Sequence, residues 1–201
     1  ARNELAEAAQ VIEKLFEQTS GDELIALAKK LADVHSQLGN GEGAHTMDDP
    51  EQLALARRCW EAELELFTRT GNVTMISRAI HGLAYVAHLS GEYERSLELS
   101  HAALRRRWAT GDIRVFPAEF EDIADVCNAT EQFEQAARLY GAASALRARI
   151  DTPIPWWYEA EFQEEVDRSR RGLSPERFAK AWADGERLTI DQALEEALAV
   201  R

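Results

Sequence analysis

Apolar residues recur at intervals of three and four positions along most of the chain, and this periodicity predicts amphipathic helices rather than strands. A leading helix is predicted over 2–19. Three helix pairs are predicted after it: 22–38 with 51–69, 73–90 with 92–110, and 116–130 with 131–150. Gly41, Gly43 and Asp48-Asp49-Pro50 predict an inserted loop over 39–50, within the first of these pairs.

The segment Asp151-Thr152-Pro153-Ile154-Pro155 interrupts the helical pattern. Three shorter helices are predicted after it, near 156–171, 174–184 and 189–200. Two of their starts carry clear signals, an N-cap followed by proline at Ser174-Pro175 and a capping box at Thr189 to Gln192. We therefore expect a three-helix cap at the C-terminal end of the chain, over 151–201.

The chain repeats itself at an interval of forty residues. Thr70-Gly71-Asn72 and Thr110-Gly111-Asp112 form the same turn signal at this interval, and Ser20-Gly21-Asp22 is a third copy. The stretch 82–93, with small residues, a glycine turn and a following aromatic, has a counterpart in 123–133. Such self-similarity indicates stacked helical repeats.

These segments resemble the tetratricopeptide repeat, in which two antiparallel helices pack through small side chains and an aromatic after the turn fills the gap. In one copy the matching residues are Leu83, Ala84, Ala87, Gly91, Tyr93, Ser96 and Ala103. In the next copy they are Ile123, Ala124, Cys127, Phe133, Ala136, Tyr140 and Ala143. The resemblance implies an all-α fold: a right-handed α-α superhelix over 1–150, closed by the cap over 151–201 within the same structural domain.

The last third of the chain is similar to the end of large bacterial regulators of the STAND class. The residues that carry this resemblance are Ala136 to Arg147, Phe178 to Gly185 and Leu188 to Leu194. Members of the class join an ATP-binding switch domain to a tetratricopeptide-like array and often to a LuxR-type DNA-binding domain; some carry a cyclase domain. The resemblance implies that the array senses an inducer or a partner and restrains the ATPase.

Two motifs of such regulators are missing from this chain. It has no Gly-x-x-x-x-Gly-Lys-Ser/Thr phosphate loop and no helix-turn-helix pattern with a basic recognition helix. It also starts without Met, in the middle of a helical pattern. We interpret it as a fragment of a longer polypeptide, with no cofactor of its own and with an ATP-binding domain as its neighbour in the full-length chain.

Trp156-Trp157-Tyr158 departs from the family, which usually continues after the proline break with charged and small residues. Aromatic side chains bury large areas, and the last repeat of an array has to close its core. We favour a sealing role for these aromatics. The alternative is an exposed contact, with Trp156 and Trp157 at the interface of a homodimer.

Composition narrows the function classes. With 36 acidic and 23 basic residues the net charge is −13, so direct nucleic-acid binding is not expected.

Cys59 and Cys127 lie within helical patterns and are interpreted as core thiols. Arg105-Arg106-Arg107 and Arg168-Ser169-Arg170-Arg171 lie near helix ends, where the macrodipole favours cations. Since neither a membrane span nor a signal peptide is visible, we predict a cytoplasmic protein without membrane contact.

In a solenoid of helix pairs the first helix of each pair lines the inner, concave surface. Positions spaced three and four apart that face this surface are the candidate groove residues. They are Lys29, Asp33 and Ser36 in the first pair, Arg78, His81, Tyr85 and His88 in the second, and Glu121, Asp125 and Asn128 in the third. Their mixed charges suit a peptide segment or a small polar inducer. A merely solvated inner face is the alternative.

Metal binding and catalysis have weaker support in the sequence than ligand binding in a groove. His81 and His88 are seven positions apart, about 10 Å along a helix, so they cannot share a metal ion without a carboxylate from another helix. We predict no metal site and no catalytic residue. Adjacent pairs such as Glu164-Glu165 and Glu195-Glu196 diverge on a helix and are interpreted as solvated faces.

The sequence therefore predicts a non-enzymatic sensing and interaction module of a larger bacterial signalling or transcription regulator. It would bind a protein, a peptide segment or a small inducer in the concave groove. A structural scaffold for homo-oligomerisation is the alternative function. An enzyme with an unrecognised active site is a third hypothesis.

Overall fold

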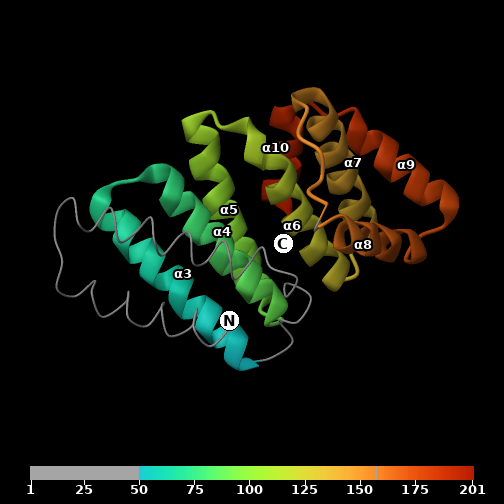
Figure 1. Cartoon of the computed structure of the whole chain (residues 1–201). Helices are drawn as coiled ribbons and strands as arrows, with labels where there is room; N and C mark the ends of the chain where they lie inside the picture. Colours follow the sequence, from blue (N-terminus) through green and yellow to red (C-terminus); the bar gives the residue numbers. More distant parts are fainter. Residues whose placement is uncertain (1–49, 157) are drawn as a thin grey trace. The chain divides into compact units, whose positions relative to one another are not determined.

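The computed structural model describes residues 50–201, apart from residue 157 (Figure 1). The regular structure of this part is entirely helical, which confirms the predicted all-α class. The predicted helices 2–19 and 22–38, and the predicted loop 39–50 up to its last residue, lie outside the described residues. Among the described helices, none combines the length and the apolar character that crossing a membrane requires.

The described elements follow the predicted order. They are α3 (Pro50–Thr70), α4 (Val73–Leu89), α5 (Tyr93–Thr110), the 3-10 helix η2 (Ile113–Val115), α6 (Phe116–Ala129), α7 (Phe133–Ile150), α8 (Glu159–Arg171), α9 (Pro175–Glu186) and α10 (Ile190–Ala199). Each predicted helix within this range is confirmed, with ends that differ by a few residues at most. The short η2 between α5 and α6 is an addition to the prediction.

The turn that recurs in the sequence recurs in the structure. Gly71 and Gly111 both adopt a left-handed backbone, with φ of 67° and 71°, which residues with a Cβ rarely do. In both turns the preceding residue, Thr70 or Thr110, donates its hydroxyl to the carbonyl three residues earlier. The same chemistry therefore ends α3 and α5.

The two predicted helix starts in the cap are confirmed. The Ser174 hydroxyl accepts a hydrogen bond from the backbone N–H of Arg177, and Pro175 lies in the first turn of α9. Thr189 and Gln192 form both hydrogen bonds of a capping box at the start of α10. These caps satisfy backbone N–H groups that the first turn of a helix leaves unpaired.

The described helices belong to two compact units, which divide between Ser90 and Gly91. The first unit contains α3 and α4, and the second contains α5 to α10. The predicted cap over 151–201 lies in the second unit together with α6 and α7. The predicted pair of 73–90 with 92–110 falls across the division, and a single continuous array stays a prediction.

In the first unit, α3 and α4 pack closely against each other. Leu66 and Phe67 of α3 are buried against apolar side chains from the start of α4. Further along, Gly82 of α4 faces the ring of Trp60, and a Cβ at this position would lie 2.3 Å from the ring. The two helices can approach this closely only because the residue that faces the indole has no side chain.

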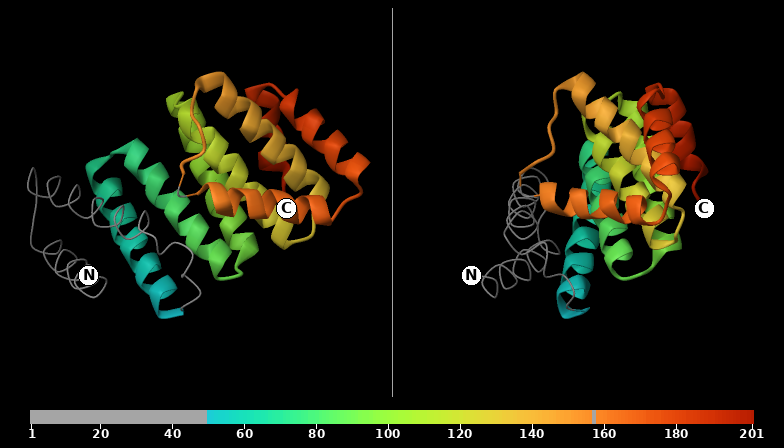
Figure 2. Two further views of the ribbon diagram at one scale, coloured as in Figure 1. Left: turned by 45° about the vertical axis from the view of Figure 1, so that its right-hand side comes forward. Right: turned by 90° about the vertical axis from the view of Figure 1, so that its right-hand side faces the viewer.

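In the second unit, the helices from α5 to α10 share one apolar core. α6 and α7 form a central pair, and α9 runs alongside α7 (Figures 1 and 2). Two glycines allow α7 and α9 to meet: a Cβ on Gly141 would lie 2.4 Å from the Trp182 carbonyl oxygen, and one on Gly185 would lie 2.0 Å from that of Arg138.

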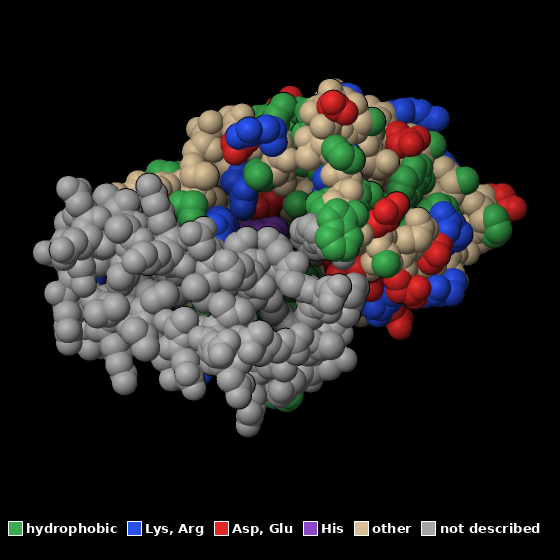
Figure 3. All heavy atoms as spheres, in the orientation of Figure 1, with side chains coloured by type: hydrophobic (Ala, Val, Ile, Leu, Met, Phe, Trp, Pro, Cys, Tyr) green, Lys and Arg blue, Asp and Glu red, His purple; other side chains and the backbone are tan. Residues whose placement is uncertain are grey.

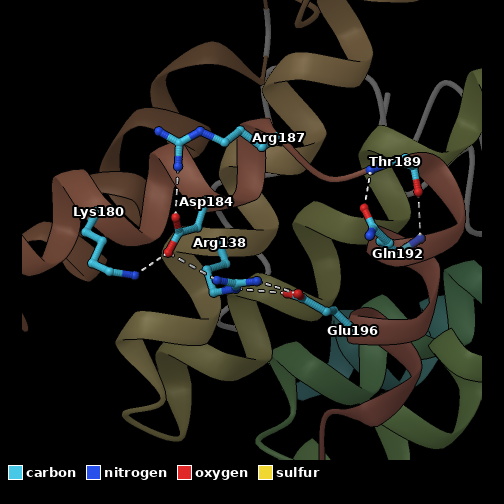
Figure 4. A network of polar contacts seen from close by, with 7 residues as sticks. All are labelled: Arg138, Lys180, Asp184, Arg187, Thr189, Gln192 and Glu196. Carbon is cyan, nitrogen blue, oxygen red and sulfur yellow. Dashed lines mark hydrogen bonds and ion pairs between the residues drawn. The ribbon is translucent and has the colours of Figure 1, made fainter.

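A network of ion pairs joins α9 and α10 to α7 (Figure 4). Arg138 of α7 pairs with Glu196 of α10 and with Asp184 of α9. Asp184 also accepts hydrogen bonds from Lys180 and Arg187, and the Lys180 ammonium group lowers the pKa of its carboxyl group. Glu196, predicted to lie on a solvated face, is therefore an anchor between helices. Because these charges are partly exposed, the pairs orient the helices more than they stabilise them.

The aromatics after the proline break do not act as one group. Trp156 is 80% exposed, so the prediction that it seals the array is wrong. Trp157 lies outside the described residues. Tyr158 packs against the core, with its ring centre 6.3 Å from that of Phe162. Of the two aromatics that the structure describes here, only Tyr158 therefore helps to close the apolar core of the second unit.

Gly141→Ala is expected to destabilise the protein, although alanine is the better helix former by about 1 kcal/mol. The added methyl group meets the Trp182 carbonyl, so α7 and α9 have to separate, at a cost of about 1–3 kcal/mol. Thermal unfolding followed by circular dichroism should show a lower midpoint. Ala148→Gly, at an exposed position of α7, is the control for helix propensity alone. An unchanged or higher midpoint for Gly141→Ala would contradict the close approach of the two helices.

Candidate functional site

The predicted groove residues form two stripes in the described part of the chain, forty positions apart. The α4 stripe, in the first unit, is partly exposed and consists of Arg78, His81, Tyr85 and His88. The α6 stripe, in the second unit, is buried and consists of Glu121, Asp125 and Asn128. Lys29, Asp33 and Ser36 lie outside the described residues.

The α4 stripe begins with an arginine that two groups of α3 hold in place. The guanidinium carbon of Arg78 lies 5.5 Å from the centre of the Trp60 ring, a distance typical of a cation–π contact. Its Nη2 lies 3.6 Å from Oε1 of Glu63, whose side chain is fully buried. The Arg78 side chain is nevertheless 32% exposed. It is therefore a positioned cation that solvent still reaches.

Asn128 is the last residue of the α6 stripe and is completely buried. Its Nδ2 donates to the backbone carbonyl of Glu165 at 2.8 Å and to Oε2 of the same residue at 3.0 Å. Its Oδ1 accepts a hydrogen bond from Oγ of Ser169 at 2.6 Å. Since Glu165 and Ser169 are one helical turn apart, a single amide of α6 holds α8 at two successive turns.

Asp125 accepts a hydrogen bond from the hydroxyl of Tyr140 on α7. Burial raises the pKa of Asp125 well above its usual range, by more than this hydrogen bond lowers it, and the nearby Asp122, Glu165 and Glu161 raise it further. Burial also raises the pKa of the Tyr140 phenol. Asp125 therefore keeps its proton to a higher pH than an exposed aspartate does.

Glu121 and Arg147 form a bidentate ion pair between α6 and α7. Nε and Nη2 of Arg147 lie 2.7 Å and 2.8 Å from the two carboxylate oxygens, and the Glu121 side chain is fully buried. Burial raises the pKa of Glu121, and Arg147 acts in the opposite direction. Nη1 of Arg147 also donates to the carbonyls of Thr152 and Pro153. Arg147 thus fixes the start of the segment that leads from α7 to α8.

Helix α8 covers the α6 stripe. It lies across α6 and α7 rather than alongside them (Figure 2), and it packs against both. The prediction that the α6 stripe lines an open groove is therefore wrong. The three side chains concerned are Glu121, Asp125 and Asn128. The reason is the break over 151–155, after which the chain turns back and places α8 on the face of α6 that carries the stripe. The periodicity of α6 does not predict this path, because it depends on residues outside α6.

Four residues of this arrangement were not predicted to be site residues: Tyr140, Arg147, Glu165 and Ser169. Tyr140 matches a position where the helices of a repeat pack together. Arg147 ends the motif 136–147, which indicates a protein family but not the ion pair that this residue forms. Glu165 belongs to a pair interpreted as solvated, but only its neighbour Glu164 is largely exposed. The available signal is the spacing of Phe162, Val166 and Ser169, which marks one buried face of α8 with a hydroxyl on it.

The basic run near the end of α8 is paired within the helix. Arg170 pairs with Asp167, and Arg171 pairs with Glu164 at 2.7 Å. Figure 3 shows acidic and basic side chains interspersed over this part of the surface. The run therefore presents no isolated patch of positive charge.

The two cysteines are buried, which confirms their predicted place in the core. Burial raises the pKa of the Cys127 thiol to about 12. The thiolate is the nucleophilic form of cysteine, so Cys127 is a packing residue at neutral pH. The chemistry that the α6 stripe offers is hydrogen bonding to the backbone and side chains of a helix.

Comparison with known proteins finds partial matches. The chain is 31% identical over 111 residues to curated relatives that carry the provisional name of HTH-type transcriptional regulators, from Mycobacterium bovis and from the CDC 1551 and H37Rv strains of Mycobacterium tuberculosis. The match covers 55% of this chain but only 13% of each relative. No family model matches the chain, and no solved structure does. The similarity to regulators fits a regulatory role.

Arg147→Met is expected to destabilise the second unit strongly. It leaves the Glu121 carboxylate buried without its cation, which costs about 3–5 kcal/mol. Denaturant unfolding measures the loss, and Arg149→Met, at an exposed position of α7, is the control. The double variant Glu121→Gln with Arg147→Met should recover part of the stability, because no unpaired charge is then buried. Equal stabilities of the single and the double variant would rule out a stranded charge as the cause.

Proposed function

We propose that the chain is a non-enzymatic sensing and interaction segment of a larger bacterial HTH-type transcriptional regulator, of the STAND class with a LuxR-type output domain. The identity to the mycobacterial regulators supports the regulatory part of this proposal. The all-helical architecture is compatible with a tetratricopeptide-like array. The segment works in the cytoplasm beside an ATP-binding domain and needs no cofactor of its own.

The observation that carries the proposal is that the α6 stripe already binds a helix. Asn128 recognises α8 through a backbone carbonyl, which any peptide offers, and through the Ser169 hydroxyl, which few positions offer. Glu121 and Asp125 continue the same face of α6. Polar side chains at these repeat positions can therefore hold a peptide segment through directional hydrogen bonds, which supports the same role for the partly exposed α4 stripe.

The α4 stripe is the proposed site for the partner or inducer. It combines a guanidinium group, two imidazoles and a phenol on partly exposed side chains. Arg78 is held by Trp60 and Glu63, so it loses little freedom when it binds a carboxylate or another anionic group. The chemistry of the stripe therefore favours a peptide or small inducer with an acidic group.

Binding acts on the regulator by changing the balance between a restrained and an active state. A ligand shifts such a balance only by the difference between its affinities for the two states. By the same linkage, the nucleotide bound to the ATP-binding domain must alter the affinity for the ligand. Equal affinity for the ligand in both nucleotide states would contradict this part of the proposal.

Tyr85→Ala in the full-length regulator is expected to reduce the transcriptional response to the inducer at least about tenfold, because aromatic anchors carry much of the energy of such sites. A reporter gene measures the response, and circular dichroism of the 201-residue chain checks that helicity is kept. Val73→Ala, at an exposed apolar position of α4, is the control. A normal response with Tyr85→Ala would refute the assignment.

A second candidate function is a scaffold for homo-oligomerisation, which the exposure of Trp156 favours. Tryptophan is enriched among the residues that carry the binding energy of protein interfaces, so an exposed Trp156 can serve as the anchor of such an interface. In this case the interaction would join copies of the chain, and the groove would stay solvated.

The scaffold hypothesis predicts a dimer for the wild-type chain and a monomer for Trp156→Ala, because the substitution removes the apolar anchor of the interface. Light scattering gives both masses. Trp108→Ala is the control, since the Trp108 ring is 41% exposed and stacks on Phe116 within its own unit. The same mass for wild type and Trp156→Ala would remove this candidate.

A further inference from the structure

Helix α5 has one face that lies outside the core of its unit. The residues that the helix buries are Ser96, Leu97, Ser100, Ala103 and Leu104. To one side of them, Nε2 of His101 lies 3.0 Å from the backbone carbonyl oxygen of Ala197 on α10. The exposed charged residues follow the remaining side of the helix: Glu94, Arg95, Glu98, Arg105 and Arg106. These five residues, together with the half-buried Ala102 between them, are called the α5 face below.

The charges of the α5 face are divided between its two ends. The N-terminal end carries Glu94 and Glu98, and Arg95 pairs with Glu98 at 2.9 Å, with both side chains more than half exposed. The C-terminal end carries Arg105 and Arg106, and no acidic side chain of the described residues forms an ion pair with either. The helix macrodipole favours this order of charges, but it supplies no counter-ion for the arginines.

The lack of an ion pair sets these two arginines apart from their neighbours. Most basic side chains of the second unit pair with a carboxylate of the same unit. Arg107, the next residue of the chain, pairs with the fully buried Glu119 at 2.7 Å. Arg105 and Arg106 point to neither the core nor a carboxylate, so they are available to a carboxylate of another molecule.

The α5 face is complementary to itself when two copies meet in antiparallel orientation. The acidic end of one helix then lies against the basic end of the other, and a twofold axis makes this contact occur twice. An axis beside Ala102 brings Glu98 of one copy opposite Arg105 of the second copy, since these residues lie four before and three after Ala102. The single methyl group of Ala102 allows the two helices to approach closely at the axis.

We propose that the α5 face is a self-association surface, at which two copies of this chain pair through antiparallel α5 helices. A second copy is the occupant because the carboxylates that Arg105 and Arg106 lack are present on the same face. Each copy contributes a single helix, so the contact is small and the association is weak. The inference does not rest on the groove function proposed above, and it places the contact between copies away from Trp156.

Analytical ultracentrifugation of the 201-residue chain tests the proposal. At about 0.1 M salt the wild type is expected to pass from monomer to dimer as its concentration rises, and about 1 M salt should return it to the monomer because the charges are then screened. Arg105→Glu with Arg106→Glu should weaken the dimer at least about tenfold, because like charges then face each other. Glu94→Arg with Glu98→Arg should have the same effect.

Mixing the two reversed variants separates this contact from a general effect of charge. Neither variant should pair with itself, but the acidic face of one and the basic face of the other should combine into a dimer with one copy of each. The control for net charge is Arg149→Glu with Arg201→Glu. It reverses two exposed cations outside the α5 face and should leave the dimer unchanged.

A wild type that stays monomeric up to about 1 mM would overturn the proposal. A dimer that persists in both reversed variants would also overturn it, as would a mixture of the two variants that stays monomeric. Trp156→Ala should keep the dimer, and a monomer for this variant would instead place the contact at Trp156. A normal response with Tyr85→Ala would refute only the function of the α4 stripe, so the two failures are distinguishable.

Discussion

The arrangement of the second unit depends on one buried amide. Asn128 lies inside the protein, where a polar group without partners costs about 1–3 kcal/mol. Besides the Tyr140 hydroxyl on α7, its partners are Glu165 and Ser169, which it reaches only if α8 lies over α6 in one register. The apolar contacts of Phe162 and Val166 alone would tolerate sliding, because apolar attraction has no direction. Arg147 adds to this constraint, since it fixes where the chain leaves α7. Position and register of α8 are therefore set by polar groups.

The two helices that pack against α7 after the proline break are attached by different contacts. α9 is attached through the close backbone approach at Gly141 and Gly185, with the ion pairs of Arg138 at the edge. α8 is attached through the hydrogen bonds of Asn128 and through its buried side chains Phe162 and Val166.

Helix positions were predictable because they depend on local signals. Periodicity, the glycines at 71 and 111, and the caps at Ser174 and Thr189 act within a few residues, and the structure confirms them. The residues of the α6 stripe were also predictable, as positions on one face of a helix. Their burial was not, because it depends on the path of the chain after residue 150, and Trp156 was misjudged for the same reason. Partners such as Asn128 and Ser169, 41 positions apart, leave no pattern in a single sequence.

The central claim is that directional polar contacts of the α6 stripe hold α8 in place. A double-mutant cycle between Asn128 and Ser169 tests it most directly. The free energy of unfolding is measured for the wild type, Asn128→Ala, Ser169→Ala and the double variant. The structure predicts a coupling energy of about 0.5–3 kcal/mol, as expected for residues in one hydrogen-bond network. Strictly additive effects, with no coupling between the two sites, would contradict the account.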